Sequence, residues 1–261
     1  MPAMSMELFD RRAVRLHRDR AARTVGQVAD VLREVAERLL DRLDDTTRRF
    51  AFALDLGGRG VVAPLLRARG IAAVSADLSP AMARLNGGMA VAADAEALPF
   101  AEASFDLVVA NLSLHWANDL PGALIQIRRA LRPEGLLLAS LPLLGTLGGL
   151  RTALAEAEAA LTGGASPRVA PFPELGDCAR LLQRAGFALP VADLDEIVLE
   201  YPDPLRLLAD LRAAGETNAL LARSRRFCPG GMFGAALAAL PEADGQVRAV
   251  LRVGFVTGWN G

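Results

Sequence analysis

The residues best suited to chemistry in this sequence are a glycine cluster and the acids that follow it. Gly57, Gly58 and Gly60 come directly after an apolar run that ends near Asp55. A glycine backbone approaches a ligand closely, and the start of the helix that follows favours a negative group. Asp77, about 20 residues further on, is placed to accept both hydroxyls of a ribose. These features fit a nicotinamide cofactor, a flavin or S-adenosylmethionine.

The spacing of the glycines favours S-adenosylmethionine among these three. A dinucleotide site spreads its glycines more widely to seat a pyrophosphate, and that spacing is absent here. S-adenosylmethionine carries no phosphate, so a tighter loop with Asp55 beside it suits the methionine amino group. Asp94 suits the exocyclic amine of adenine, and the apolar residues after it suit the face of the ring. Those residues are Ala95, Leu98, Pro99 and Phe100.

His115 and Trp116 follow a further apolar segment, at the point where substrates approach sheets of this kind. A histidine in this position has the chemistry of a general base. An alternative is that His115 bonds the backbone and fixes its loop. Trp116 is more often a packing residue than a surface on which a substrate stacks. The sequence leaves both interpretations of His115 open.

Five apolar segments are predicted strands, and helical patterns lie between most of them. The predicted strands fall within 50–56, 71–77, 89–94, 104–111 and 136–142, and the predicted helices within 28–43, 61–69, 79–85 and 120–131. Uniformly apolar strands that alternate with helices predict a parallel sheet covered on both faces. Asp55, Asp77, Asp94 and Asn111 fall at or near the carboxyl ends of strands, where such sheets bind ligands.

Composition narrows the possible functions. The chain has 261 residues, a net charge of -1, and 29 basic residues that are all arginine. No global field attracts nucleic acid, and the absence of lysine excludes a P-loop lysine or a Schiff base. Two histidines and two widely separated cysteines predict no metal site. No apolar run approaches the roughly 18 residues of a transmembrane segment.

The last third of the chain has a different organisation. Helical patterns cover 146–161, 175–187 and 204–215, and the closing segment 247–259 predicts a strand that pairs antiparallel at the edge of the sheet. The expected organisation is an N-terminal helical cap over 1–49, a cofactor-binding core over 50–142, and a C-terminal half over 143–261 that completes the sheet with helical additions.

Several segments together resemble a known family. "ALDLGGRG", "SADLSP", "ADAEALPFAEASFDLVVANLSLHW" and "ALRPEGLLL" are similar to successive motifs of class I S-adenosylmethionine-dependent methyltransferases. "LFDRRAVRLHRDRAA", "SPRVAPF", "GETNA" and "TGW" further resemble the complex I assembly factor 5 family, which is close to the malonyl-carrier-protein methyltransferases of biotin synthesis. The resemblance runs from Leu8 to Trp259.

The resemblance implies a Rossmann-like α/β fold with a seven-stranded, mostly parallel sheet, helices on both faces and an N-terminal helical cap. It also implies the residues that hold S-adenosylmethionine. These are Arg18, Asp55, Gly57, Gly58, Gly60, Asp77, Leu78, Asp94, Ala95, Asn111 and Leu112. The glycine loop departs from the family spacing DxGxGxG because one residue between the first two glycines is missing. Gly58 stands in place of the second glycine.

The function that follows is methyl transfer from S-adenosylmethionine to an unidentified acceptor, in the cytoplasm, with His115 as the candidate catalytic residue. The arginine-rich segment His17–Ala22 is expected to close over the cofactor rather than to form a cleaved presequence. One alternative is hydroxylation of an arginine on an iron–sulfur subunit of respiratory complex I. Another is a non-catalytic assembly chaperone with a degenerate loop. In each case the expected partner is a complex I subunit or another protein acceptor, not nucleic acid.

Overall fold

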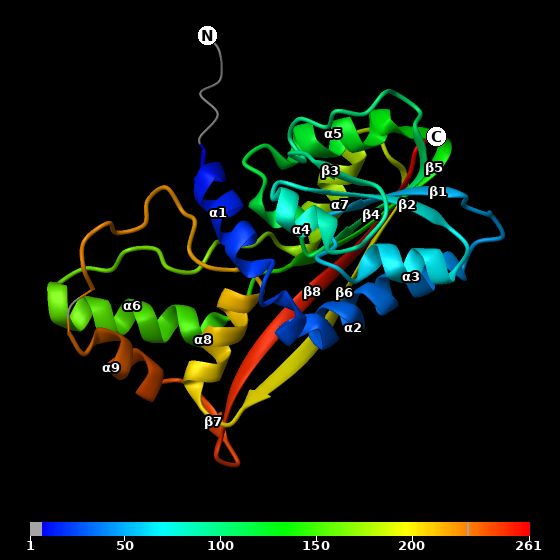
Figure 1. Cartoon of the computed structure of the whole chain (residues 1–261). Coiled ribbons are helices and arrows are strands. Elements are labelled where there is room, and N and C mark those ends of the chain that lie inside the picture. The colour runs from blue at the N-terminus through cyan, green and yellow to red at the C-terminus, as the bar shows by residue number, and fades with distance from the viewer. Residues whose placement is uncertain (1–6, 229) are drawn as a thin grey trace, which may run out of the picture.

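A computed structural model describes residues 7–228 and 230–261, so residues 1–6 of the expected N-terminal cap lie outside the described residues. The core is one sheet in the order β3-β2-β1-β4-β5-β8-β6, with a short strand β7 paired to β8 (Figure 1). The parallel strands are β1 (Phe52–Leu56), β2 (Ala72–Asp77), β3 (Ala90–Ala92), β4 (Phe105–Asn111) and β5 (Leu131–Pro142). The predicted α/β fold is therefore confirmed.

Helices cover both faces of the sheet, as predicted. On one face lie α2 (Ala29–Leu40) and α3 (Val62–Ala68); on the other lie α5 (Leu120–Ala130) and α7 (Leu175–Arg184). The side chains of successive residues in each central strand point to opposite faces of the sheet, because side chains alternate along a strand. In β4, Val109 packs with the α2 side and Val108 with the α5 side.

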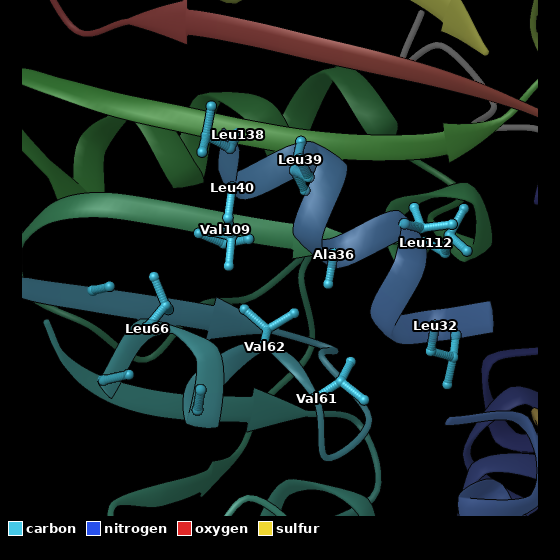
Figure 2. Close-up of a cluster of buried hydrophobic side chains, with 14 of the residues drawn as sticks. Leu32, Ala36, Leu39, Leu40, Val61, Val62, Leu66, Val109, Leu112 and Leu138 are labelled. Carbon is cyan, nitrogen blue, oxygen red and sulfur yellow. The ribbon is translucent and has the colours of Figure 1, made fainter. Parts of the chain in front are cut away.

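The face under α2 shows why this segment forms a helix at this place. Leu32, Ala36 and Leu39 recur at helical spacing and are buried against the sheet (Figure 2). Val62 of α3 and Val109 of β4 complete this packing. Leu32, at the start of this buried stripe, lies on the side of Val61 and Leu112, so the packing supports the backbone that follows the glycine loop and β4 (Figure 2).

The C-terminal half adds two long strands, β6 (Ala188–Tyr201) and β8 (Gln246–Trp259), which pair antiparallel. Strand β8 also pairs antiparallel with β5, so it lies inside the sheet and β6 forms the edge. The prediction that segment 247–259 lies at the edge was wrong. An apolar strand pattern indicates burial and not the order in which strands pair.

Three helices pack on the far ends of β6 and β8. They are α6 (Gly148–Thr162), α8 (Pro204–Ala213) and α9 (Met232–Ala238). Figure 1 shows them gathered beside the sheet, next to the N-terminal helix α1 (Arg11–Ala21). The sequence did not predict α9 or β7 (Glu242–Ala243), which are short and follow loop-like residues.

The remaining elements are a short helix and three single 3-10 turns. They are α4 (Pro80–Arg84), η1 (Val25–Val28), η2 (Asp41–Leu43) and η3 (Leu114–Trp116). Ser79 caps α4 by accepting from Met82 N at 3.1 Å, at the start of the helix predicted within 79–85. The third strand stops at Ala92, two residues before the predicted end at Asp94. Within the described ranges, every helix is too short or too polar to cross a bilayer.

Candidate functional site

A narrow cleft opens at the carboxyl ends of β1 and β2, where the fold places ligand sites. Its volume is about 40 Å³, which is smaller than a nucleoside. The lining residues come from α1, the end of β1 and the glycine loop, the end of β2, and the segments after β3 and β4. They are Arg11, Val14, Arg18, Leu56, Gly57, Ala76, Asp77, Leu78, Ala93, Ala95, Ser113 and Trp116. Five of the predicted cofactor residues therefore meet here.

Helix α1 lies across this cleft and pairs with two acids, Asp77 in the cleft lining and Asp94, whose neighbours Ala93 and Ala95 line the cleft. The Arg18 guanidinium lies 3.4 Å from the Asp77 carboxylate, and both side chains are buried. Arg11, two turns earlier on the same helix, pairs with Asp94 and donates to the carbonyl of Trp116 at 2.7 Å. The helix thus covers the ribose-type and adenine-type carboxylates together, which explains why the cleft is small.

The glycine loop approaches its neighbours closely. Gly57 has φ +76, and its N–H donates to the Ala76 carbonyl at 2.7 Å. A Cβ at Gly57 would lie 2.5 Å from the Cβ of Ser113, which no side chain tolerates. A Cβ at Gly58 would lie 2.0 Å from the Asp55 Oδ1. The first two glycines are therefore required by close approach, one to the cleft wall and one to a buried acid.

Asp55 lies beneath the loop and not in the cleft. Its Oδ2 accepts from Ala63 N at 3.1 Å, Ser75 Oγ at 3.3 Å and Asn86 Nδ2 at 3.1 Å. The side chain is fully buried. Burial raises the pKa of Asp55 to about 7, against the opposing hydrogen bonds of Ala63 and Ser75. In this structure Asp55 ties β1, β2 and the start of α3 together.

Asp55 should make the folding stability depend on pH. Between the ordinary pKa of 3.8 and about 7, the folded protein keeps the proton and the unfolded chain has lost it, so stability falls as pH rises through this window. We expect Asp55→Asn to gain in unfolding free energy relative to the wild type over the same window, by at most about 4 kcal/mol. Urea unfolding at about pH 4 and about pH 8 measures this difference. Exposed Asp30→Asn is the control, and equal curves for both variants would contradict the assignment.

A second group of polar residues lies behind the cleft, around Glu216. Its carboxylate accepts from His115 Nε2 at 2.9 Å and from Trp116 Nε1 at 3.0 Å, and it lies 2.9 Å from Arg59 Nη1. Arg59 also donates to the carbonyl of Leu112. Arg59 and Leu112 have φ of 48 and 47, a left-handed conformation that residues other than glycine adopt rarely. Such backbone outliers concentrate at functional sites.

The charges of this group set the protonation of His115. Burial lowers the pKa of His115, and the charges of Arg59 and Arg18 lower it further, against the opposing effect of Glu216. Burial raises the pKa of Glu216, but the neighbouring His115 and Arg59 lower it by more. The net effect is a pKa well below the usual value for a glutamate. With Nε2 donating to Glu216, neutral His115 presents its Nδ1 lone pair, which has no hydrogen-bond partner among the described residues. This is the arrangement of a carboxylate-oriented general base.

The structure distributes the remaining predicted residues over three places. Gly60, at φ +88, lies at the turn into α3. Asn111 donates to the Leu32 carbonyl at 3.0 Å and accepts from Ser140 Oγ at 2.8 Å, so its amide links the sheet to α2. Leu112 and His115 line a larger cavity on the other side of the segment 112–116.

Sequence reasoning missed Arg11, Arg59 and Glu216. Arg11 belongs to an arginine-rich stretch in which no residue stands out, and Arg59 reads as a spacer between two glycines. Glu216 carries no spacing signal, because it lies 101 residues from His115. In the ranges 7–228 and 230–261, no group of three or more His, Cys, Asp or Glu side chains is arranged to hold a metal ion.

Comparison of the sequence with known proteins places the chain in a family. Residues 54–139 match the family described as "Methyltransferase domain". The chain is 38% identical to the human protein named arginine-hydroxylase NDUFAF5, mitochondrial, over 98% of this chain and 78% of that protein. It is 36% identical to malonyl-[acyl-carrier protein] O-methyltransferase of Xylella fastidiosa, over 97% of this chain and 88% of that protein.

A solved structure supports the fold. The YcgJ protein of Bacillus subtilis superposes with a TM-score of 0.57, covering 85% of this chain and 97% of the other, at 14% identity. At this identity the likeness concerns the arrangement of strands and helices alone. The arrangement of strands and helices is therefore that of a Rossmann-like α/β fold.

Proposed function

Because the chain belongs to the class I S-adenosylmethionine-dependent methyltransferases, in the family that includes NDUFAF5 and the malonyl-[acyl-carrier protein] O-methyltransferases, we propose that it moves a methyl group from S-adenosylmethionine to an acceptor held beside His115. The observation that carries this proposal is the position of the segment 112–116. Its Ser113 lines the cofactor-type cleft, Leu112 and His115 line a separate cavity, and Trp116 lines both.

The cleft has the side chains that the cofactor requires. Asp77 at the end of β2 would accept the ribose hydroxyls, and Leu78 and Ala95 would contact the adenine ring. Gly57 would let the loop backbone approach the methionine end. Asp77 and Asp94 are both paired with α1, so the proposed binding mode requires Arg18 and Arg11 to give up these carboxylates. The cofactor then supplies a sulfonium-bound methyl group, which is electrophilic.

The protein's own contribution is positioning and proton removal. Displacement at a sulfonium needs an aligned acceptor and the exclusion of water, and a base only where the acceptor loses a proton. His115, oriented by Glu216, has its Nδ1 available for that proton.

Calorimetric titration with S-adenosylmethionine tests the proposal. We expect saturable binding at a single site, and binding about ten- to a hundredfold weaker for Asp77→Asn, because a charged acceptor of two hydroxyl hydrogen bonds is lost. The amide oxygen of asparagine still accepts from Ser79 N, as Asp77 Oδ1 does at 2.8 Å, so the turn is preserved. Exposed Asp30→Asn on α2 is the matched control. Absence of heat at saturating cofactor for the wild type would favour a non-catalytic assembly role.

A second candidate function is hydroxylation of an arginine on a protein partner. It is favoured by the identity to human NDUFAF5, which is named an arginine-hydroxylase and mitochondrial. On this alternative the partner is a subunit of respiratory complex I. Incubation with such a subunit followed by peptide mass measurement separates the two reactions, because methylation adds the mass of a methylene and hydroxylation that of an oxygen atom.

The proposed location is the cytoplasm. The arginine-rich segment that superficially resembles an organelle presequence includes α1, which packs on the cleft through Arg11, Val14 and Arg18. Removal of this segment would expose Asp77 and Asp94, so we propose that it stays in the mature protein.

A further inference from the structure

Trp116 lies between the two spaces that the proposed reaction must join. The cofactor-type cleft has a volume of about 40 Å³ and the larger cavity a volume of about 330 Å³. Trp116 lines both of them, and among the described residues no other does. A methyl group passes directly from the donor sulfur to the acceptor atom, so donor and acceptor have to be in contact. Trp116 therefore stands where the two molecules must meet.

The N-terminal segment holds Trp116 in this position from the side of the cleft. The Trp116 carbonyl accepts from Arg11 Nη1 at 2.7 Å. Arg11 pairs in turn with Asp94, the candidate acid for adenine, and its Nε lies 3.3 Å from Glu96. The Phe9 ring packs edge-on against the indole, with the ring centroids 5.1 Å apart. One arginine thus connects Trp116 to a carboxylate that the cofactor is proposed to use.

From the side of the cavity the indole is held by a carboxylate. Trp116 Nε1 donates to Glu216 Oε2 at 3.0 Å, and His115 Nε2 lies 2.9 Å from the same oxygen. Because Trp116 is only 5% exposed, water competes little for this hydrogen bond. A hydrogen bond to a charged group is among the stronger ones in a protein, so it stabilises the present position of the indole. Trp116 is therefore connected to both binding regions at once.

Only the larger of the two spaces has room for a displaced indole. The cleft can hold a few water molecules and no aromatic ring. The cavity is far larger, and apolar side chains such as Leu150, Phe172 and Leu208 line it. An indole that turns into the cavity therefore stays in contact with apolar surface and out of water.

We propose that Trp116 is a gate between the cleft and the cavity, and that binding of the cofactor opens it. When the nucleoside takes Asp94 from Arg11, the arginine that holds the Trp116 carbonyl loses its own partner. The indole then leaves Glu216 and turns into the cavity, which joins the two spaces. The acceptor meets the donor only once the donor is bound, so S-adenosylmethionine binds first. This role of Trp116 rests on the proposed function.

Replacing Trp116 with phenylalanine distinguishes a gate from a fixed wall. Phenylalanine keeps an aromatic ring but has no N–H for Glu216, so one hydrogen bond to a charged group no longer has to break. We expect calorimetry to show S-adenosylmethionine binding about tenfold more tightly than to the wild type. A fixed wall only loses contact area in this variant, so equal or weaker binding would overturn the proposal. The control is Trp259→Phe, which should leave the affinity unchanged, because Trp259 stacks on Phe50 and pairs with Leu136 away from the cleft.

The Trp259→Phe protein also allows movement of the gate to be observed directly. The sequence has two tryptophans, so Trp116 is the single one left in this variant. Acrylamide quenching of its fluorescence is measured with and without saturating S-adenosylhomocysteine, which carries the nucleoside but no sulfonium. We expect the quenching constant to rise when the ligand binds, because the indole moves into the open cavity. A ligand that merely covers a fixed indole would lower the constant or leave it unchanged, and either result would contradict the gate.

Calorimetry on the wild type separates this role of Trp116 from the proposed function. If S-adenosylmethionine does not bind to the wild type, the proposed function fails and the gate fails with it. If the cofactor binds but Trp116→Phe binds it no more tightly, only the gate is wrong. The quenching measurement decides the question if Trp116→Phe does not fold, because it leaves Trp116 in place.

Discussion

Replacing His115 with glutamine is expected to slow methyl transfer by about a hundred- to ten-thousandfold, the usual effect of losing a general base. The glutamine amide reaches the position of His115 Nε2 and can still donate to Glu216, which His115 contacts at 2.9 Å. What is lost is the basic nitrogen at Nδ1. The rate of S-adenosylhomocysteine formation in the presence of an acceptor measures the effect, and calorimetry with S-adenosylmethionine should show unchanged affinity.

The pH profile separates a chemical role of His115 from a structural one. Since burial and the nearby arginines lower the pKa of His115, the wild-type rate should be level around neutrality and fall only on the acid side, where the imidazole becomes protonated. The glutamine variant should show no such fall. If its residual rate had the same acid limb as the wild type, another group would be the base.

The substitution with the largest expected effect on stability is Glu216→Ala, at about 3–5 kcal/mol of unfolding free energy. It leaves the Arg59 charge buried without its partner, and it removes the acceptor for both His115 and Trp116. Arg59 has a side chain only 2% exposed, so water offers it little compensation. Chemical unfolding of the variant and the wild type measures the difference.

The matched control is Glu200→Ala, which breaks the exposed pair between Glu200 and Arg248 at 2.9 Å. Surface pairs of this kind contribute less than about 1 kcal/mol. Glu216→Gln should fall between the two, because it retains an acceptor and loses the charge. Equal losses for Glu216→Ala and Glu200→Ala would show that Arg59 finds another partner when Glu216 is absent.

The parts of the fold that the sequence predicts well are those with strong local periodicity. The strand before Gly57, the strand before Asp77 and the helix with Leu32 and Leu39 were all read from apolar spacing and are present in the structure. The position of β8 inside the sheet was not predictable in this way. An apolar strand reads the same whether one or both of its edges are paired, and only the tertiary structure decides between them.

The site shows the same limit. Acids at strand ends were found because parallel strands bring their carboxyl ends to one edge, and Asp77 lies there as predicted. Asp55 also stands at a strand end, but its carboxylate is held in the interior by hydrogen bonds from Ala63 N and Ser75 Oγ. Glu216 and Arg59 meet across 157 positions of sequence, a contact that no local pattern encodes. The shortened loop therefore contributes Arg59, whose side chain lines the larger cavity and pairs there with Glu216.

The pairing of α1 with the cleft has a consequence for regulation. Arg11 and Arg18 occupy the two carboxylates that a nucleoside would use, so helix and cofactor compete for Asp94 and Asp77. Coupling between two binding events is reciprocal. On the proposed mode of binding, a protein that grips α1 in its released position would tighten cofactor binding, and the cofactor would tighten the grip of that protein by the same factor. A partner that binds the released N-terminal helix would then bind more tightly when S-adenosylmethionine occupies the cleft.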